Sequence, residues 1–283
     1  MRAALAHTLF SELLRLPALI HHEDGSDETP RERRALGSTW ARRLGLGKSA
    51  GLVVPTELLE GEALVRWQQP LGRVKAIRDG VDLSRFAAPA PKTPRLARLV
   101  KRPDERWIVC EAGPEAIAAL AARLTDCGQD WHLVIIGAEV DAPAGLEHRV
   151  HRVVAGEDRV LLMQLADIVV VAKGHEPLPL RAIEAMAAGR PIVAFETGAM
   201  SANLASENAP FLAAQGDNAG LAARMQALCR RTGRGCHDRR LSPALCKRHA
   251  ARHDLKLFQP AFTHAPAGGD GLRAAIEQRR APA

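Results

Sequence analysis

The chain has 283 residues, of which 47% are hydrophobic, so it can bury the core of one or two domains. No apolar run approaches the roughly 18 residues of a membrane span, and we expect a cytoplasmic protein. Tyr is absent and aromatic residues make up 4% of the chain. This composition leaves few side chains to stack on bases, which argues against a binder of single-stranded nucleic acid.

The formal net charge of +7 is concentrated toward the C-terminus. Residues 221–283 hold 13 Lys and Arg against 4 Asp and Glu, whereas the rest of the chain holds 26 against 28. A segment this basic can contact an anionic membrane surface, so peripheral binding to the inner face of a membrane is one interpretation. The alternative is a solvated tail, and binding of nucleic acid is less favoured.

The first part of the chain alternates predicted helices and strands. Hydrophobic patterning predicts helices over 3–16, 33–46 and 58–68, and strands over 18–20, 51–56 and 74–77. The first of these strands leads into a polar loop at His21–Gly25. A stretch rich in Pro and Ala, 87–94, has the composition of a linker between domains.

The second part continues the alternation. It predicts strands over 107–110, 132–137, 150–154, 167–172, 192–195 and 209–212, and helices over 114–127, 160–165, 180–188, 219–230 and 244–258. Several of these strands are continuous apolar runs, as expected of parallel strands covered on both faces. Strands that alternate with helices indicate an α/β protein with doubly wound parallel sheets.

Two carboxylates stand inside the apolar pattern of the second part. Glu176 lies in the loop between the strand at 167–172 and the next helix, and Glu184 lies in that helix. Ligands of open α/β sheets bind at the carboxyl ends of strands, and the free N–H groups of a helix that begins near Leu180 can hold a phosphate. Glu176 could thus bind sugar hydroxyls and Glu184 a ribose. The alternative is a helix cap and a second Glu on the solvent face.

The five cysteines do not form a metal motif. Their odd number and the absence of a C-x2-C pair favour free thiols over disulfides or a zinc site; they are Cys110, Cys127, Cys229, Cys236 and Cys246.

Five motifs in a fixed order carry a family resemblance. They are His21–Gly25, Val53–Thr56, Ile77–Phe86, Leu133–Gly137 and the E-x7-E element Glu176–Glu184. In this order they resemble the retaining glycosyltransferases of family 4, the glycosyl transferases group 1, which have the GT-B fold.

The resemblance implies a function and a set of site residues. It implies a hexosyltransferase-type enzyme for polysaccharide biosynthesis that moves a sugar from a nucleotide-sugar to a glycan or lipid-linked acceptor, with retention of configuration and without a cofactor or metal. Catalytic roles fall to His21 and Glu176. Donor binding falls to Glu176, Pro179, Leu180, Glu184, Gly113 and Gly156, and a hinge to Asp79, Gly80 and Asp82.

The same resemblance divides the chain into regions. We expect a truncated, acceptor-side Rossmann-like region at 1–88, a linker at 89–94, a complete nucleotide-sugar-binding domain at 95–260 and a basic, flexible tail at 261–283. An incomplete half-sheet would expose an edge and an apolar face, which favours homo-oligomerisation.

At two places the sequence differs from the family pattern. The family has Arg and Lys after the first strand of the donor domain, where they neutralise the diphosphate, but Glu111–Ala116 holds two acids and no base. Pro179 stands where the family has Gly. These differences keep open an alternative function, a weakened or inactive remnant that binds nucleotide or a partner protein. They also predict that Arg and Lys introduced at Ala112 and Ile117 strengthen diphosphate binding.

Overall fold

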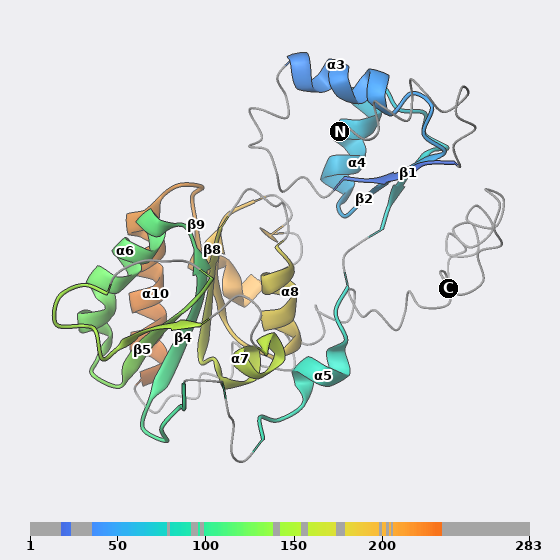
Figure 1. The fold of residues 1–283 in the computed structure, drawn as a ribbon. Coiled ribbons are helices and arrows are strands. Elements are labelled where there is room, and N and C mark those ends of the chain that lie inside the picture. Colours follow the sequence, from blue (N-terminus) through green and yellow to red (C-terminus); the bar gives the residue numbers. More distant parts are fainter. Residues whose placement is uncertain are drawn as a thin grey trace. The chain divides into compact units, whose positions relative to one another are not determined.

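The computed structural model divides the chain into two compact units between Asp79 and Gly80, which we call the first and second units (Figure 1). The structure describes residues 18–23, 36–77, 80–91, 96, 99–137, 142–153, 158–173, 179–197, 200–201, 204 and 206–233. Each unit is built around its own parallel sheet.

In the described residues of the first unit, three strands and two helices surround a small core. The strands β1 (Ile20–His22), β2 (Gly51–Val54) and β3 (Val74–Ala76) form a parallel sheet in the order β1-β2-β3. The helices are α3 (Leu36–Gly45) and α4 (Glu57–Val65), and the side chain of Thr56 caps α4 by accepting a hydrogen bond from the backbone N–H of Leu59.

The strand predicted at 18–20 lies two residues further along the chain. His21 pairs with Leu52 and His22 with Val53, so residues expected in a loop belong to β1. β1 pairs with one described neighbour, β2, and its side chains are exposed or half-buried. Because the side chains of β1 are not buried, polar histidines are tolerated in it. A hydrophobic pattern alone therefore does not locate this strand.

In the second unit, the described strands form a sheet in the order β6-β5-β4-β7-β8-β9, with every pair parallel. The strands are β4 (Arg106–Ala112), β5 (Trp131–Ile136), β6 (Val150–Val153), β7 (Ile168–Ala172), β8 (Ile192–Phe195) and β9 (Leu212–Ala213). The helices are α5 (Leu83–Ala87), α6 (Pro114–Leu124), α7 (Arg159–Leu165), α8 (Leu180–Ala187) and α10 (Asn218–Gly233), with 3-10 turns at Thr125–Cys127 and Ser206–Phe211.

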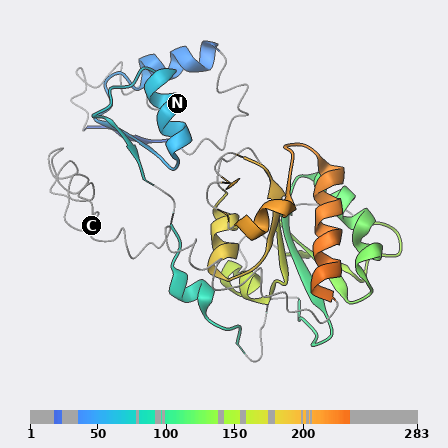
Figure 2. The same ribbon diagram turned by 180° about the vertical axis from the view of Figure 1, so that it is seen from behind.

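Helices cover both faces of this sheet, which explains the continuous apolar strands. Ile108 and Val170 lie in one buried cluster with residues of α6 and α10. The alternate positions, Val109 and Val171, lie in a second cluster with residues of α7 and α8 and with Phe86 of α5. In Figure 2 the orange α10 and green α6 lie side by side on one face. Because these strands are all parallel, their carboxyl ends lie along one edge of the sheet.

Candidate functional site

The carboxyl edge of the second sheet gathers charged side chains from four elements. Glu111 stands near the end of β4 and Lys173 directly after β7, while Arg181 and Glu184 lie on α8 and Arg159 begins α7. This edge is where open α/β sheets bind their ligands. We call these five residues the Arg181 cluster.

Arg181 lies between two carboxylates. Its Nε is 2.7 Å from Oε2 of Glu111, and its Nη1 donates a hydrogen bond to Oε2 of Glu184. Burial alone lowers the pKa of Arg181, but the charges and hydrogen bonds of Glu184 and Glu111 outweigh it and raise that pKa above its usual range. The guanidinium is therefore held in place as a cation.

Two further cations flank this arrangement. Nζ of Lys173 is 3.8 Å from Oε1 of Glu111, and Nε of Arg159 is 4.0 Å from Oε1 of Glu184. The exposed fractions of the side chains are 61% for Lys173 and 46% for Arg159, against 3% for Glu184. With three cations and two carboxylates, the cluster has an excess of one positive charge, and Lys173 and Arg159 are its most exposed members.

A hollow opens beside the cluster, between the ends of β7 and β8 and the start of α8. Pro179 is the N-cap residue of α8 and has no side-chain cap, so the first N–H groups of this helix lie at the same edge. The hollow is lined by Val171, Ala172, Lys173, Pro179, Ala194, Phe195, Thr197, Met200 and Gln215. One lysine, a mostly apolar lining and a helix N-terminus together suit an anionic organic ligand.

Four residues predicted for donor binding lie at this edge. Pro179 and Leu180 begin α8, Glu184 is in its second turn, and Gly113 is the N-cap residue of α6. The buried carboxylate of Glu184 pairs with Arg181, so it is not the solvent-facing helix residue of the alternative interpretation. Whether it contacts a ribose stays a prediction. Glu176 and Gly156, which were also predicted for this site, lie outside the described residues.

Two of the predicted hinge residues lie at the start of the second unit. Gly80 begins the second unit, and Asp82 is the N-cap residue of α5, where its Oδ1 accepts a hydrogen bond from the backbone N–H of Ser84 at 3.0 Å. Asp79 lies outside the described residues.

His21 lies in the first unit beside a buried ion pair. Its Nε2 is 3.6 Å from Oε2 of Glu23, and Arg42 donates to both oxygens of the same carboxylate at 3.3 Å. The His21 side chain keeps 19% of its surface exposed. A histidine that is oriented by a carboxylate and still reached by solvent can bind a ligand or exchange a proton.

The sequence predictions missed Glu111, Arg159, Lys173 and Arg181 as members of the site. The pair Arg181–Glu184 has the spacing i, i+3 of a helical ion pair and was detectable. The contact between Arg181 and Glu111 joins residues that are distant in sequence, and it exists because β4 and β7 are neighbours in the sheet. The sequence of β4 or of β7 alone does not predict that these two strands pair.

Comparison with known proteins finds similarity over this part of the chain. Residues 111–231, which contain the Arg181 cluster, match the family model described as glycosyl transferases group 1. The chain resembles the group 1 glycosyltransferases.

Relatives of this group cover part of the chain. A D-inositol 3-phosphate glycosyltransferase of Salinispora tropica is 28% identical over 186 residues, which are 55% of this chain and 39% of that protein. A GDP-mannose:cellobiosyl-diphosphopolyprenol alpha-mannosyltransferase of Xanthomonas campestris is 30% identical over 149 residues, 48% of this chain and 38% of that protein. The chain thus spans about two fifths of the length of these curated relatives.

Solved glycosyltransferase structures share the fold. Anabaena Alr3699/HepE in complex with UDP-glucose has a TM-score of 0.66 at 16% identity, covering 98% of this chain and 76% of that one. A sucrose-phosphate synthase of Thermosynechococcus elongatus has a TM-score of 0.65 at 18% identity, covering 98% and 71%. The predicted α/β, GT-B-like fold is confirmed. Among the described residues, no helix is long and apolar enough to cross a membrane.

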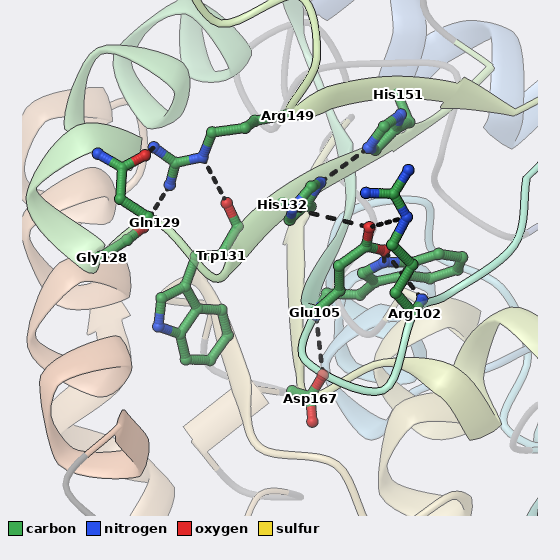
Figure 3. Close-up of polar contacts among 10 residues, drawn as sticks. Arg102, Glu105, Gly128, Gln129, Trp131, His132, Arg149, His151 and Asp167 are labelled. Atoms are coloured by element: carbon green, nitrogen blue, oxygen red, sulfur yellow. Dashed lines mark hydrogen bonds and ion pairs between the residues drawn. The ribbon is translucent and has the colours of Figure 1, made fainter.

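A second polar cluster occupies the opposite, amino edge of the same sheet (Figure 3). Nδ1 of His132 lies 2.9 Å from Nε2 of His151, and the two rings stack with centroids 5.2 Å apart. Burial lowers the pKa of both imidazoles. Nearby, the buried guanidinium of Arg149 donates to the carbonyls of Trp131 and Gly128. The described residues include no group of three metal-ligating side chains here or elsewhere. These contacts tie strand ends and loops together and leave the carboxyl edge as the candidate site.

Proposed function

We propose that the protein is a glycosyltransferase that moves a hexose from a nucleotide-sugar to a glycan or lipid-linked acceptor with retention of configuration. The observation that carries this proposal is the Arg181 cluster with its adjoining hollow, at the carboxyl edge of a sheet within the segment that matches group 1 glycosyltransferases. The complex of the structurally similar Alr3699/HepE with UDP-glucose supports a nucleotide-sugar as the donor.

Different residues of the second unit bind different parts of the nucleotide-sugar. Glu176 accepts hydrogen bonds from the hydroxyls of the transferred sugar, and Glu184 orients the ribose side of the nucleotide. Leu180 offers its backbone N–H to the phosphates, and Pro179 and Gly113 are the N-cap residues of α8 and α6, whose first turns have no side-chain cap. This binding needs neither a metal nor a cofactor. For His21, on the first unit, we infer a catalytic role from the family resemblance.

The runner-up is a remnant that binds nucleotide without efficient transfer. It is favoured by one observation, that Arg181 is already paired with two carboxylates. In this case a nucleotide-sugar binds, but the bond between its sugar and its diphosphate is not cleaved.

Thermal unfolding of the full chain with UDP-, GDP- and ADP-glucose tests donor binding. Because a ligand at 100 times its Kd stabilises the native state by about 2.7 kcal/mol, the right donor should raise the Tm by about 5 °C or more. Glu176→Ala should remove most of this shift. Glu147→Ala is the control, since Glu147 is exposed and precedes β6 at the opposite edge. Equal shifts in wild type and Glu176→Ala would contradict the assigned role of Glu176.

The product separates the two functions. A retaining transferase breaks the bond between C1 of the hexose and the diphosphate, joins C1 to the acceptor hydroxyl oxygen in the anomeric configuration of the donor, and releases the nucleoside diphosphate. NMR of the product detects both changes. A donor that binds and stays intact with every acceptor and with water supports the remnant.

A further inference from the structure

The first observation is that the segment joining β4 to α6 contains no Lys or Arg. The donor-domain strand β4 ends in Glu111 and Ala112 and runs into α6 without a base. Ala112 is 3% exposed and Ile117, in the first turns of α6, is 1% exposed. A cationic side chain at either position would be buried in the core, where an unpaired charge is costly. These two positions therefore offer no site for a phosphate-binding cation.

The second observation is that Arg181 of α8 places its guanidinium at the carboxyl end of β4. Arg181 reaches across to the end of β4, where its Nε lies 2.7 Å from Glu111. Arg presents a rigid fork of donors that matches the oxygens of a phosphate, and such charge-assisted bonds are among the strongest in proteins. A cation from another element thus occupies the edge that β4 and α6 leave without one.

The third observation is that the two carboxylates on Arg181 differ in access. The Glu184 side chain is 3% exposed and lies one helical turn from Arg181, so it holds the guanidinium from the buried side. The Glu111 side chain is 20% exposed and also holds Lys173, which is 61% exposed. A ligand that replaces the Glu111 carboxylate therefore gains two cations, Arg181 and Lys173, in one exchange.

We propose that Arg181 is the diphosphate-binding cation of the nucleotide-sugar site and that Glu111 is an internal counter-anion which the diphosphate displaces. This inference rests on the proposed function. Glu111 is paired with Arg181 in the structure, and the phosphate oxygens take its place on the guanidinium when the donor binds. Glu184 keeps Arg181 positioned throughout, and Lys173 turns from Glu111 to the second phosphate.

The exchange gives Glu111 and Arg181 opposite effects on affinity. Calorimetry on the full chain with UDP, GDP and ADP measures them, with uridine, guanosine and adenosine as phosphate-free probes. Glu111→Gln should tighten nucleoside diphosphate binding, by roughly 3- to 10-fold, because the amide competes less for the guanidinium. Arg181→Gln should weaken it roughly 10- to 100-fold, the range expected for charge-assisted hydrogen bonds. Binding of the nucleosides should change little in either variant.

Controls and a rescue separate binding from folding. Glu147→Gln and Arg102→Gln make the same charge changes at exposed positions away from the carboxyl edge and should leave affinity unchanged. If Arg181→Gln lowers the Tm without ligand, Arg181→Lys, which keeps the charge, should restore most of the affinity. In the double variant Glu111→Gln/Arg181→Gln, the gain from Glu111→Gln should shrink to the part that the release of Lys173 contributes.

The outcomes distinguish this inference from the proposed function. If UDP or GDP binds the wild type and neither Glu111→Gln nor Arg181→Gln changes the affinity, the exchange is wrong while the donor site stands. A gain from Glu111→Gln that is equally large without Arg181 also overturns it. If neither UDP, GDP nor ADP binds the wild type or Glu111→Gln, the proposed donor site itself fails and the inference falls with it.

Discussion

At the scale of single residues, Glu23 is the carboxylate with a shifted pKa among the described residues of the first unit. Burial raises its pKa, but hydrogen bonds from His21 and Arg42 and the charge of Arg42 outweigh burial and lower the pKa from 4.5 to about 2. A carboxyl whose pKa is lower in the folded than in the unfolded state stabilises the fold above the unfolded pKa. That stability is present above about pH 4.5 and is lost as the pH falls toward 2.

We therefore predict that Glu23→Gln lowers the free energy of unfolding of the first unit by about 2 kcal/mol at pH 7, after allowance for partial solvent access. The difference from wild type should shrink as the pH falls and vanish near pH 2. Urea unfolding followed by tryptophan fluorescence measures it, because the guanidinium of Arg42 lies 4.9 Å from the ring of Trp67. A difference that is equal at pH 7 and pH 3 would refute the role of the ion pair.

The candidate site shows what residue patterns predict and what they omit. Glu184, Pro179, Leu180 and Gly113 were found because each stands at a fixed offset from a strand or helix end. Arg181 was passed over because its partner Glu111 belongs to a different motif, 70 positions earlier in the sequence. Single-sequence patterns report neighbours along the chain, whereas the charge balance of this site depends on which strands pair.

At the scale of elements, burial along β4 and α6 changes one expectation. The sequence register placed a phosphate-binding Arg and Lys at Ala112 and Ile117, which implied that restoring them would strengthen binding. Ile117 instead packs in the core with Leu120 and Leu133 and is 1% exposed. A Lys there would lose these contacts and bury an unpaired ammonium.

We predict that Ile117→Lys destabilises the second unit by about 3–5 kcal/mol, the cost of a buried uncompensated charge, and does not strengthen UDP binding. Ile117→Val, which removes one methylene, should cost about 1 kcal/mol. Denaturant unfolding with fluorescence from Trp107 and Trp131, which lie in the same unit, provides the comparison. Wild-type stability in Ile117→Lys would show that the helix can turn this position to solvent.

The strands themselves were largely predictable, and their order was not. Continuous apolar runs located β4, β5, β7 and β8 within two residues, because parallel strands covered on both faces leave an unmistakable hydrophobic signal. The last strand was placed at 209–212, but Pro210 lies in a 3-10 turn and β9 is Leu212–Ala213. The central place of β4, between β5 and β7, follows from crossover connections that periodicity does not encode.

At the scale of the whole molecule, the two units differ in how much apolar surface they bury. Among the described residues, the first unit has a core cluster of seven fully buried residues, built on three strands. Seven of the eight large apolar side chains that stay exposed also belong to it: Ile20, Leu36, Trp40, Leu44, Leu58, Val65 and Leu71. Small cores give marginal stability, and exposed apolar patches favour association.

We predict that the first unit either associates with a second copy or is the least stable part of the chain. Limited proteolysis at low protein concentration should cut within residues 1–79 first and leave a fragment of about Gly80 to Gly233. The fragment should start at Gly80 rather than near Pro94, because Val81 and Phe86 are buried in the core of the second unit. Its parallel sheet and two-sided helical cover should keep it folded.

Sizing chromatography over a range of concentrations separates the two possibilities. Association predicts a larger species whose first unit gains protection from proteolysis as concentration rises. Trp40→Ser, an exposed position on α3, should weaken such a dimer without lowering the Tm of the second unit. Low stability without association predicts a monomer whose first unit is cut at every concentration. A monomer whose first 79 residues resist cleavage as well as the rest would show that the three-stranded unit is stable alone.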